Sequence, residues 1–248
     1  MTAHEEIRIG ISACLLGDKV RFDGGHKRDG FLTSTVSEFV DFVPVCPEVD
    51  IGLGTPREAI RLLRAADGPR LVGVKSGNDH TDAMRKYAKS KARELKKLAL
   101  CGFIVKRDSP SCGLERVRIY DKNGSPSKDG QGLFTRDLVT SNPYLPVEEE
   151  GRLNDPRLRE NFFERVFAYR RLRTLFGQRW TLGSLVEFHT REKMFLLAHD
   201  PKTYRELGRL VAEAKQLERT ALRDSYEELF MLALSKKAST AKNTNVLQ

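Results

Sequence analysis

Three cysteines, Cys14, Cys46 and Cys112, each follow a short apolar stretch that is typical of a buried β-strand. These stretches are residues 7–11, 42–45 and 103–106. The carboxyl ends of parallel strands lie at one edge of a sheet, so cysteines 32 and 66 positions apart can converge there. Cys101 instead precedes its strand, and we expect it at the opposite edge as a small buried group.

Three thiolates without a fourth ligand suit a soft metal centre that keeps one open coordination position. A closed structural zinc site would require a fourth ligand and usually shows paired Cys-x-x-Cys spacing, which is absent here. A catalytic zinc and a [4Fe-4S] cluster both remain open from the spacing. The alternative is that three unrelated thiols happen to follow strands.

Acidic and hydroxyl side chains accompany two of these cysteines. Glu48 lies two residues after Cys46, and Ser109 and Ser111 precede Cys112 in a loop that contains Pro110. We expect Glu48 to activate a water or carry a proton, and Ser109 to orient a substrate or the water. Solvated loop groups and ordinary turn capping are the alternatives.

Residues 1–152 alternate short β-branched stretches with helical patterns. Further strands are predicted at residues 71–74 and 117–120, and helices at 79–98 and 132–139. Strands separated by helices favour an α/β fold with a three-layer, mostly parallel sheet. The segment 52–57, with its Gly-x-Gly pattern, is expected to precede a helix and is only a weak signal for anion binding.

Residues 153–248 are predicted to form a small all-α helical domain, after a linker at residues 143–154. Apolar residues at helical spacing predict helices around residues 158–169, 185–198, 204–217 and 222–234. This part carries 18 basic and 12 acidic side chains, which is two thirds of the formal net charge of +9. The arginine-dense stretch that begins at Arg157 and includes Arg170 and Arg171 indicates phosphate contacts, although a solvated helix face is the alternative.

Composition limits the class of protein. Hydrophobic residues make up 40% of the chain and no apolar run approaches bilayer length, so a membrane-spanning role is excluded. The acidic N-terminus fits neither a secretory signal nor a transit peptide, so we expect a cytoplasmic protein. The excess of basic over acidic side chains favours a polyanionic partner.

Four ordered motifs resemble the thiouracil desulfidase family over about residues 7–145. The motifs are Ser12-Ala13-Cys14-Leu15-Leu16-Gly17, Arg21-Phe22-Asp23-Gly24-Gly25, Cys46-Pro47-Glu48 and Ser109-Pro110-Ser111-Cys112-Gly113. The second part, about residues 153–248, is similar to the helical domain that is fused to this one in tRNA 4-thiouridine desulfidases. Phe188-His189-Thr190-Arg191-Glu192-Lys193 and Leu197-Ala198-His199-Asp200-Pro201 carry that similarity. The family often has a second histidine where Glu192 stands and continues beyond Gln248, and the sequence does not define whether this chain is shortened at its C-terminus.

The resemblance implies a [4Fe-4S] cofactor with Cys14, Cys46 and Cys112 as ligands, and Glu48 and Ser109 as catalytic residues. We expect a second group of residues to contact the substrate: Asp23, Ser111, Arg157, Arg170 and Arg171. The implied activity is removal of sulfur from 4-thiouridine in tRNA, which gives uridine and sulfide without net electron transfer.

Two other functions remain open at this point. One is a desulfidase that acts on free thiouracil or thionucleosides, and the other is a non-catalytic RNA-binding regulator that uses its thiols for a structural metal or redox sensing. The residues do not define the oligomeric state.

Overall fold

The computed structural model describes residues 7–238 and residue 244, and these form two compact units, Met1–Leu153 and Asn154–Gln248. Each unit is described by itself. Among the described residues, no helix combines the length and the apolar character needed to span a bilayer.

The first unit is built on a sheet of four parallel strands in the order β2-β1-β5-β8. The strands are β1 (Arg8–Ser12), β2 (Asp41–Val45), β5 (Gly102–Val105) and β8 (Val147–Glu149). The first three confirm the predicted strands with shifts of about one residue. The predicted linker at residues 143–154 is wrong in part, because β8 pairs with β5 from Phe103↔Val147 to Val105↔Glu149.

A second sheet, in the order β4-β3-β6-β7, holds the other two predicted strands, so the expectation of one sheet is wrong. Its strands are β3 (Ile60–Leu63), β4 (Arg70–Gly73), β6 (Val117–Tyr120) and β7 (Pro126–Gly130). Only β3 and β6 are parallel, and β3–β4 and β6–β7 are antiparallel. Segment 52–57 leads into β3 and not into a helix. In the β6–β7 turn, Asp121 accepts hydrogen bonds from the backbone N–H of Asn123 and Ser125.

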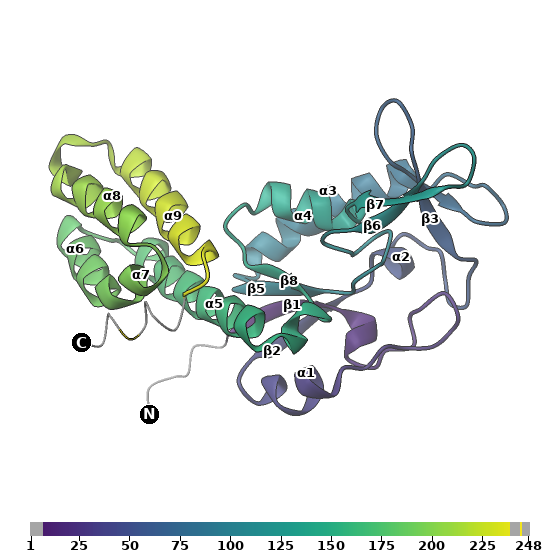
Figure 1. Cartoon of the computed structure of the whole chain (residues 1–248), viewed down its shortest axis with the longest axis horizontal. Coiled ribbons are helices and arrows are strands. Elements are labelled where there is room, and N and C mark those ends of the chain that lie inside the picture. The colour runs from purple at the N-terminus through teal and green to yellow at the C-terminus, as the bar shows by residue number, and fades with distance from the viewer. Residues whose placement is uncertain (1–6, 239–243, 245–248) are drawn as a thin grey trace. The chain divides into compact units, whose positions relative to one another are not determined.

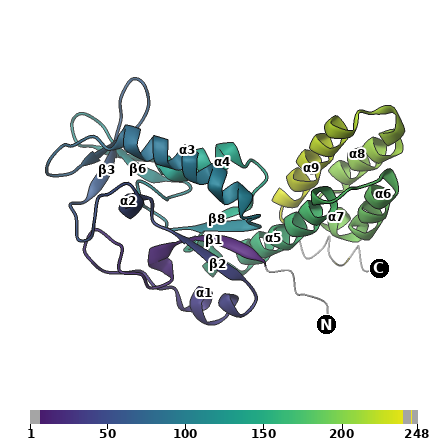
Figure 2. The same cartoon turned by 180° about the vertical axis from the view of Figure 1, so that it is seen from behind.

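Helices cover both faces of the parallel sheet, which confirms the three-layer α/β fold (Figures 1 and 2). On one side lie α3 (Thr81–Lys97) and α4 (Leu133–Ser141), and on the other lie α1 (Gly30–Ser34) and the short helix Val36–Glu38. Helix α3 buries Met84, Ala88, Ala92 and Leu95, whose spacing places them on one face. In the core beneath α3 and α4, the Phe103 and Phe134 rings pack with centroids 5.9 Å apart.

The second unit is all helical, as predicted. Its helices are α5 (Pro156–Gly177), α6 (Leu182–Arg191), α7 (Lys193–His199), α8 (Pro201–Ala212) and α9 (Arg219–Ser235). The single helix predicted at residues 185–198 is instead two helices that meet at Glu192. The buried Glu192 carboxylate accepts two hydrogen bonds from Arg171, at 2.6 and 2.7 Å, which ties this junction to α5. Of the polar end at residues 236–248, the part at 239–243 and 245–248 lies outside the described residues.

Candidate metal centre

The three cysteines singled out by their spacing follow three neighbouring strands of the parallel sheet. Cys14 lies in the short helix Ala13–Leu15 directly after β1, and Cys46 follows β2 as the N-cap of α2 (Pro47–Asp50). Cys112 lies in the loop that follows β5. Because β1 pairs with both β2 and β5 in parallel, all three residues lie at the carboxyl edge of the sheet.

These cysteines line one cavity of about 380 Å³. The charged and hydroxyl side chains on its wall are Ser12, Arg21, Lys27, Glu48, Arg57, Lys106, Arg107, Asp108 and Ser109. Cys101, which precedes β5, is buried and is not among the lining residues; its thiol donates to the Ala99 carbonyl at 3.7 Å. The structure therefore separates Cys101 from the other three cysteines, as predicted.

Burial disfavours the charged thiolate form of the three cysteines that line the cavity. It raises the pKa of the Cys14 thiol to about 11, with a further contribution from nearby Cys46. It also raises the pKa of the Cys46 thiol, and raises the pKa of the Cys112 thiol well above its usual range. Three thiolates in this cavity need compensating positive charge, which a bound metal centre supplies.

The three cavity cysteines form a donor set that suits a soft metal centre. In the part of the chain that the structure describes, no group of three or more His, Cys, Asp or Glu side chains is arranged to hold a single metal ion. Cys14, Cys46 and Cys112 all line this one cavity. Three soft sulfur donors would leave a bound metal centre with one open coordination position.

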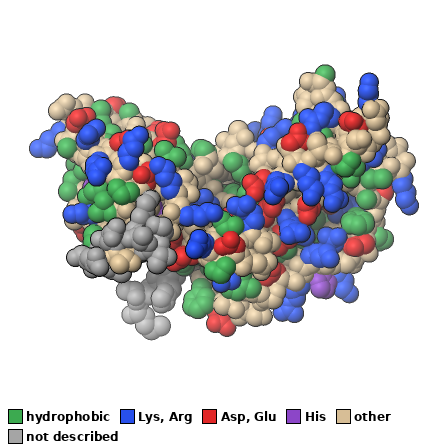
Figure 3. Space-filling view, in the orientation of Figure 1, with side chains coloured by type: hydrophobic (Ala, Val, Ile, Leu, Met, Phe, Trp, Pro, Cys, Tyr) green, Lys and Arg blue, Asp and Glu red, His purple; other side chains and the backbone are tan. Residues whose placement is uncertain are grey.

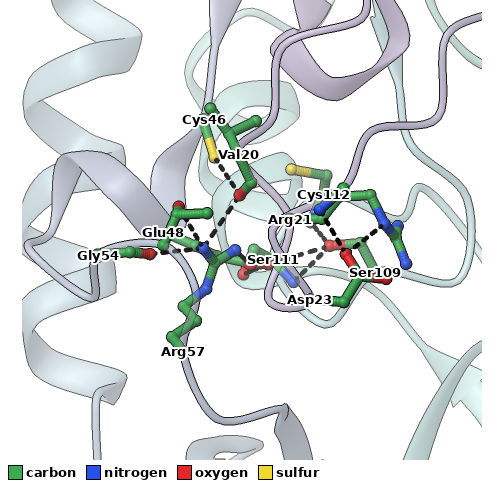
Figure 4. Close-up of polar contacts among 12 residues, drawn as sticks. Val20, Arg21, Asp23, Cys46, Glu48, Gly54, Arg57, Ser109, Ser111 and Cys112 are labelled. Carbon is green, nitrogen blue, oxygen red and sulfur yellow. Dashed lines mark hydrogen bonds and ion pairs between the residues drawn. The ribbon is translucent and has the colours of Figure 1, made fainter.

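Glu48 stands on the cavity wall at the centre of a polar network (Figure 4). Its Oε1 accepts a hydrogen bond from Ser111 Oγ at 2.9 Å and lies 3.5 Å from Ser109 Oγ. Its Oε2 forms an ion pair with Arg57, which also donates to the carbonyls of Val20 and Gly54 at 3.0 and 2.8 Å. The carboxylate is thereby fixed in position beside the cysteines.

The loop that carries Cys112 is held by its own side chains. Ser109 Oγ accepts hydrogen bonds from the backbone N–H of Ser111 and Cys112 at 3.2 and 3.0 Å. Ser109 therefore caps this turn, as the alternative interpretation expected, and it also lines the cavity. Gly132 packs so closely on this loop that a Cβ there would lie 2.4 Å from the Ser111 carbonyl oxygen.

Two residues predicted to contact substrate do not line the cavity. Ser111 is fully buried and its hydroxyl is directed to Glu48, so it acts through that carboxylate. Asp23 lies in an exposed turn, where it accepts a hydrogen bond from Gly25 N at 3.0 Å and pairs with Arg21 at 3.5 Å. Asp23 thus contacts Arg21, which lines the cavity.

Arg57, which pairs with Glu48 on the cavity wall, is a site residue that the sequence did not predict. It follows Gly54 and Pro56 in an irregular segment, where no periodicity indicates which way a side chain points. Only the fold shows that this segment returns to Glu48. An arginine after a glycine-rich turn was the available signal, and it is too common to identify a partner.

Replacing Arg57 by methionine is expected to lower the free energy of unfolding by about 3 kcal/mol, because Glu48 would be left as a nearly buried, unpaired charge. Denaturant titration of full-length protein measures this. In the double variant Arg57→Met with Glu48→Gln, the decrease in the free energy of unfolding should be smaller than the sum of the decreases in the two single variants. Strictly additive losses would show that the ion pair does not position Glu48.

The arginines of the helical unit have mixed environments. Arg157 is exposed in the first turn of α5, and Arg170 is half-buried. Arg171 is held by Glu192, and its guanidinium carbon lies 5.9 Å from the centre of the Phe195 ring. Arg171 therefore stabilises the helical unit, and this ion pair competes with any contact to phosphate.

Comparison with protein families finds a match in each part of the chain. Residues 9–150 match the family described as 2-thiouracil desulfurase. Residues 193–248 match DUF1722, a family of proteins of unknown function. The first match contains all three cavity cysteines, Glu48 and Ser109.

Individual relatives each match a part of the chain. The uncharacterized protein YbbK of Bacillus subtilis (strain 168) is 30% identical over 150 residues, which is 58% of this chain and 97% of that protein. The uncharacterized protein YbgA of Escherichia coli (strain K12) is 32% identical over 96 residues, which is 38% of this chain and 57% of YbgA. The solved structure of the [4Fe-4S]-dependent thiouracil desulfidase TudS is 31% identical, with a TM-score of 0.51, and covers 64% of this chain and 99% of its own.

Proposed function

Since the chain belongs to the 2-thiouracil desulfurase family, we propose that it is a [4Fe-4S]-dependent desulfidase that converts 4-thiouridine in tRNA to uridine and sulfide. The observation that carries this proposal is the single cavity that combines Cys14, Cys46 and Cys112 with Glu48 and Ser109. The likeness to TudS, a cluster-dependent enzyme, supports the choice of cofactor over zinc.

The three cysteines would hold the cluster. When bound, it supplies a soft Lewis-acid iron with no protein ligand, which prefers a thiocarbonyl sulfur to the hard oxygen groups of the cavity. The cavity residues then have to place the ring carbon of the substrate near a water molecule. No residue on the wall needs to change its oxidation state.

Glu48 and Ser109 provide the groups for the water reaction. The Glu48 carboxylate, fixed by Arg57 and Ser111, accepts a proton from water, and the Ser109 hydroxyl is placed to orient that water or the substrate. The water oxygen forms the new bond to carbon as the carbon–sulfur bond breaks. The two protons of the water end on the sulfur, which leaves as hydrogen sulfide, so there is no net oxidation or reduction.

The helical unit supports tRNA as the substrate. Residues 153–248 carry 18 basic and 12 acidic side chains, and Arg157 is exposed at the start of α5. Figure 3 shows that Lys and Arg side chains are also numerous on the first unit, where Lys27 and Lys106 line the cavity. A nucleotide within RNA must leave its stack to reach such a cavity, and phosphate contacts elsewhere hold the RNA while it does so.

Arg157→Ala is expected to weaken binding of 4-thiouridine-containing tRNA and to reduce the slope of log affinity against log salt by about 1. Filter binding across a salt series measures both. Lys128→Ala removes the same charge from exposed β7 and should leave the slope unchanged. Neither variant should alter turnover of free 4-thiouridine. If the slope of log affinity against log salt were the same in Arg157→Ala and in wild type, Arg157 would not contact the RNA.

Turnover of three substrates separates this proposal from its alternatives. We expect sulfide release to be much more efficient from modified tRNA than from 4-thiouridine or thiouracil. Equal efficiency with the free compounds would instead favour a desulfidase of free thiopyrimidines. Tight RNA binding without sulfide release from any of the three would favour a non-catalytic regulator.

A further inference from the structure

Phe22 is an aromatic side chain on the cavity wall that the chemistry described above does not use. It is 41% exposed, and it is the sole aromatic residue among the cavity-lining residues of the described structure. A large apolar ring left exposed to water forgoes the stabilisation of burial. Apolar rings on the walls of cavities are commonly covered by a bound ligand.

The ring belongs to a turn that is held in place by the backbone. Arg21 N donates to the Gly25 carbonyl at 3.2 Å, and Gly25 N donates to the Asp23 carboxylate at 3.0 Å. The Phe22 carbonyl accepts a hydrogen bond from Arg57 N at 2.9 Å. The same Arg57 pairs with Glu48, so the ring and the proposed base of the reaction share one rigid support.

Arg21 lies over Phe22, with its guanidinium carbon 5.4 Å from the centre of the ring. This guanidinium is held in turn by Asp23 at 3.5 Å. A cation over a ring is a favourable pair, and it leaves the opposite face of the ring as the one on which a second planar group can stack. The resulting platform is flat, apolar and bordered by positive charge, which are the properties that single-stranded nucleic-acid sites use to hold bases.

We propose that Phe22 stacks on the pyrimidine ring of the thiolated substrate, and that it thereby selects a nucleobase over thiocarbonyl compounds that lack an aromatic ring. This inference rests on the proposed function, because it names the group that recognises its substrate. A base that leaves the stack of an RNA loses contacts with its neighbours, and a ring in the cavity replaces part of them. Phe22 is thus a specificity-determining residue, while Glu48 and Ser109 act on the reacting atoms.

The test compares Phe22→Ala, Phe22→Leu and Phe22→Trp in the full-length, cluster-containing protein. Phe39→Ala is the matched control, because Phe39 is 68% exposed and does not line the cavity. Dissociation constants are measured for 4-thiouridine and for thiourea, which has the thiocarbonyl group but no ring. KM and kcat for 4-thiouridine are measured on the same preparations.

Phe22→Ala is expected to raise both Kd and KM for 4-thiouridine by roughly fivefold to a hundredfold, in line with the loss of one aromatic–base stack. Its kcat should change much less. Phe22→Trp should retain affinity, Phe22→Leu should resemble Phe22→Ala, and Phe39→Ala should behave as wild type. Affinity for thiourea should be the same in all of these proteins.

Wild-type affinity for 4-thiouridine in Phe22→Ala or in Phe22→Leu would overturn the stacking role. An equal loss of affinity for thiourea would overturn the selection for a ring. A wild-type protein that binds 4-thiouridine through Phe22 but releases no sulfide would refute the proposed function and leave the stack intact. Wild-type turnover of 4-thiouridine in all Phe22 variants would support the proposed function and overturn the stacking role of Phe22.

Discussion

Replacing Glu48 by glutamine is expected to lower sulfide release by about two to four orders of magnitude, which is the usual contribution of general acid–base catalysis. Glutamine keeps the size of the side chain and still accepts a hydrogen bond from Ser111, but it cannot take a proton from water. The cluster and the fold should be retained. Single-turnover assays with 4-thiouridine, on protein of known iron content, measure the effect.

Glu115→Gln is the control for this substitution. Glu115 is exposed, pairs with Arg152 and does not line the cavity, so its loss should leave turnover unchanged. Ser109→Ala should also keep iron but reduce turnover, since it removes the hydroxyl that faces Glu48. If Glu48→Gln with a full cluster released sulfide at the wild-type rate, Glu48 would have no part in the reaction.

The second large effect concerns the cysteines. Cys14→Ala, Cys46→Ala and Cys112→Ala should each lose most of their iron and all measurable desulfuration, because a cluster held by three thiolates is left with two. Cys101→Ala should keep both, since Cys101 lies at the opposite edge of the sheet and outside the cavity. Iron and acid-labile sulfide analysis after anaerobic purification measures these contents.

Misfolding would give the same loss of iron, so the thermal unfolding of each apoprotein is compared with that of the wild-type apoprotein. Similar transitions would assign the loss to the missing ligand. Equal iron contents in Cys14→Ala and Cys101→Ala, with both proteins folded, would refute the ligand assignment. So would wild-type iron content in any one of the three lining variants.

Three strands of the parallel sheet could be predicted because they are short, apolar and bounded by turns. The apolar stretches of β1, β2 and β5 are continuous enough to recognise, and they place the three cysteines at one edge. Helix α3 is predicted by the capping-type residues Asn78 and Asp79 and by the basic, alanine-containing stretch that follows them. The position of the cavity follows from these elements and from the edge rule for parallel strands.

Other elements carry no such signal. Strand β7, with the sequence Pro-Ser-Lys-Asp-Gly, is polar and pairs at the end of a sheet through its backbone. The short strand β8 contains two glutamates, Glu148 and Glu149, whose burial is explained by a local ion pair with Arg152 and by a tertiary hydrogen bond from the backbone of Leu114. Division of the strands between two sheets depends on pairing partners, which local periodicity does not specify.

The same limit applies to the site. Glu48 and Ser109 were identified from their neighbours in sequence, and the structure places both on the cavity wall with the cysteines. Arg57 and the supporting role of Ser111 depend on which side chains meet across the fold, and no spacing rule predicts that. In the helical unit, the break at Glu192 likewise follows from its partner Arg171, 21 residues away.

Three cysteines are expected to leave one iron of the cluster open to the sulfur of the substrate. This can be measured by Mössbauer spectroscopy of protein reconstituted with iron-57, with and without a thiolated pyrimidine. We expect about four iron atoms per chain and a change confined to about one quarter of the iron signal when the ligand is added. A spectrum that the ligand leaves unchanged, or a protein that takes up zinc and no iron under the same conditions, would contradict the account.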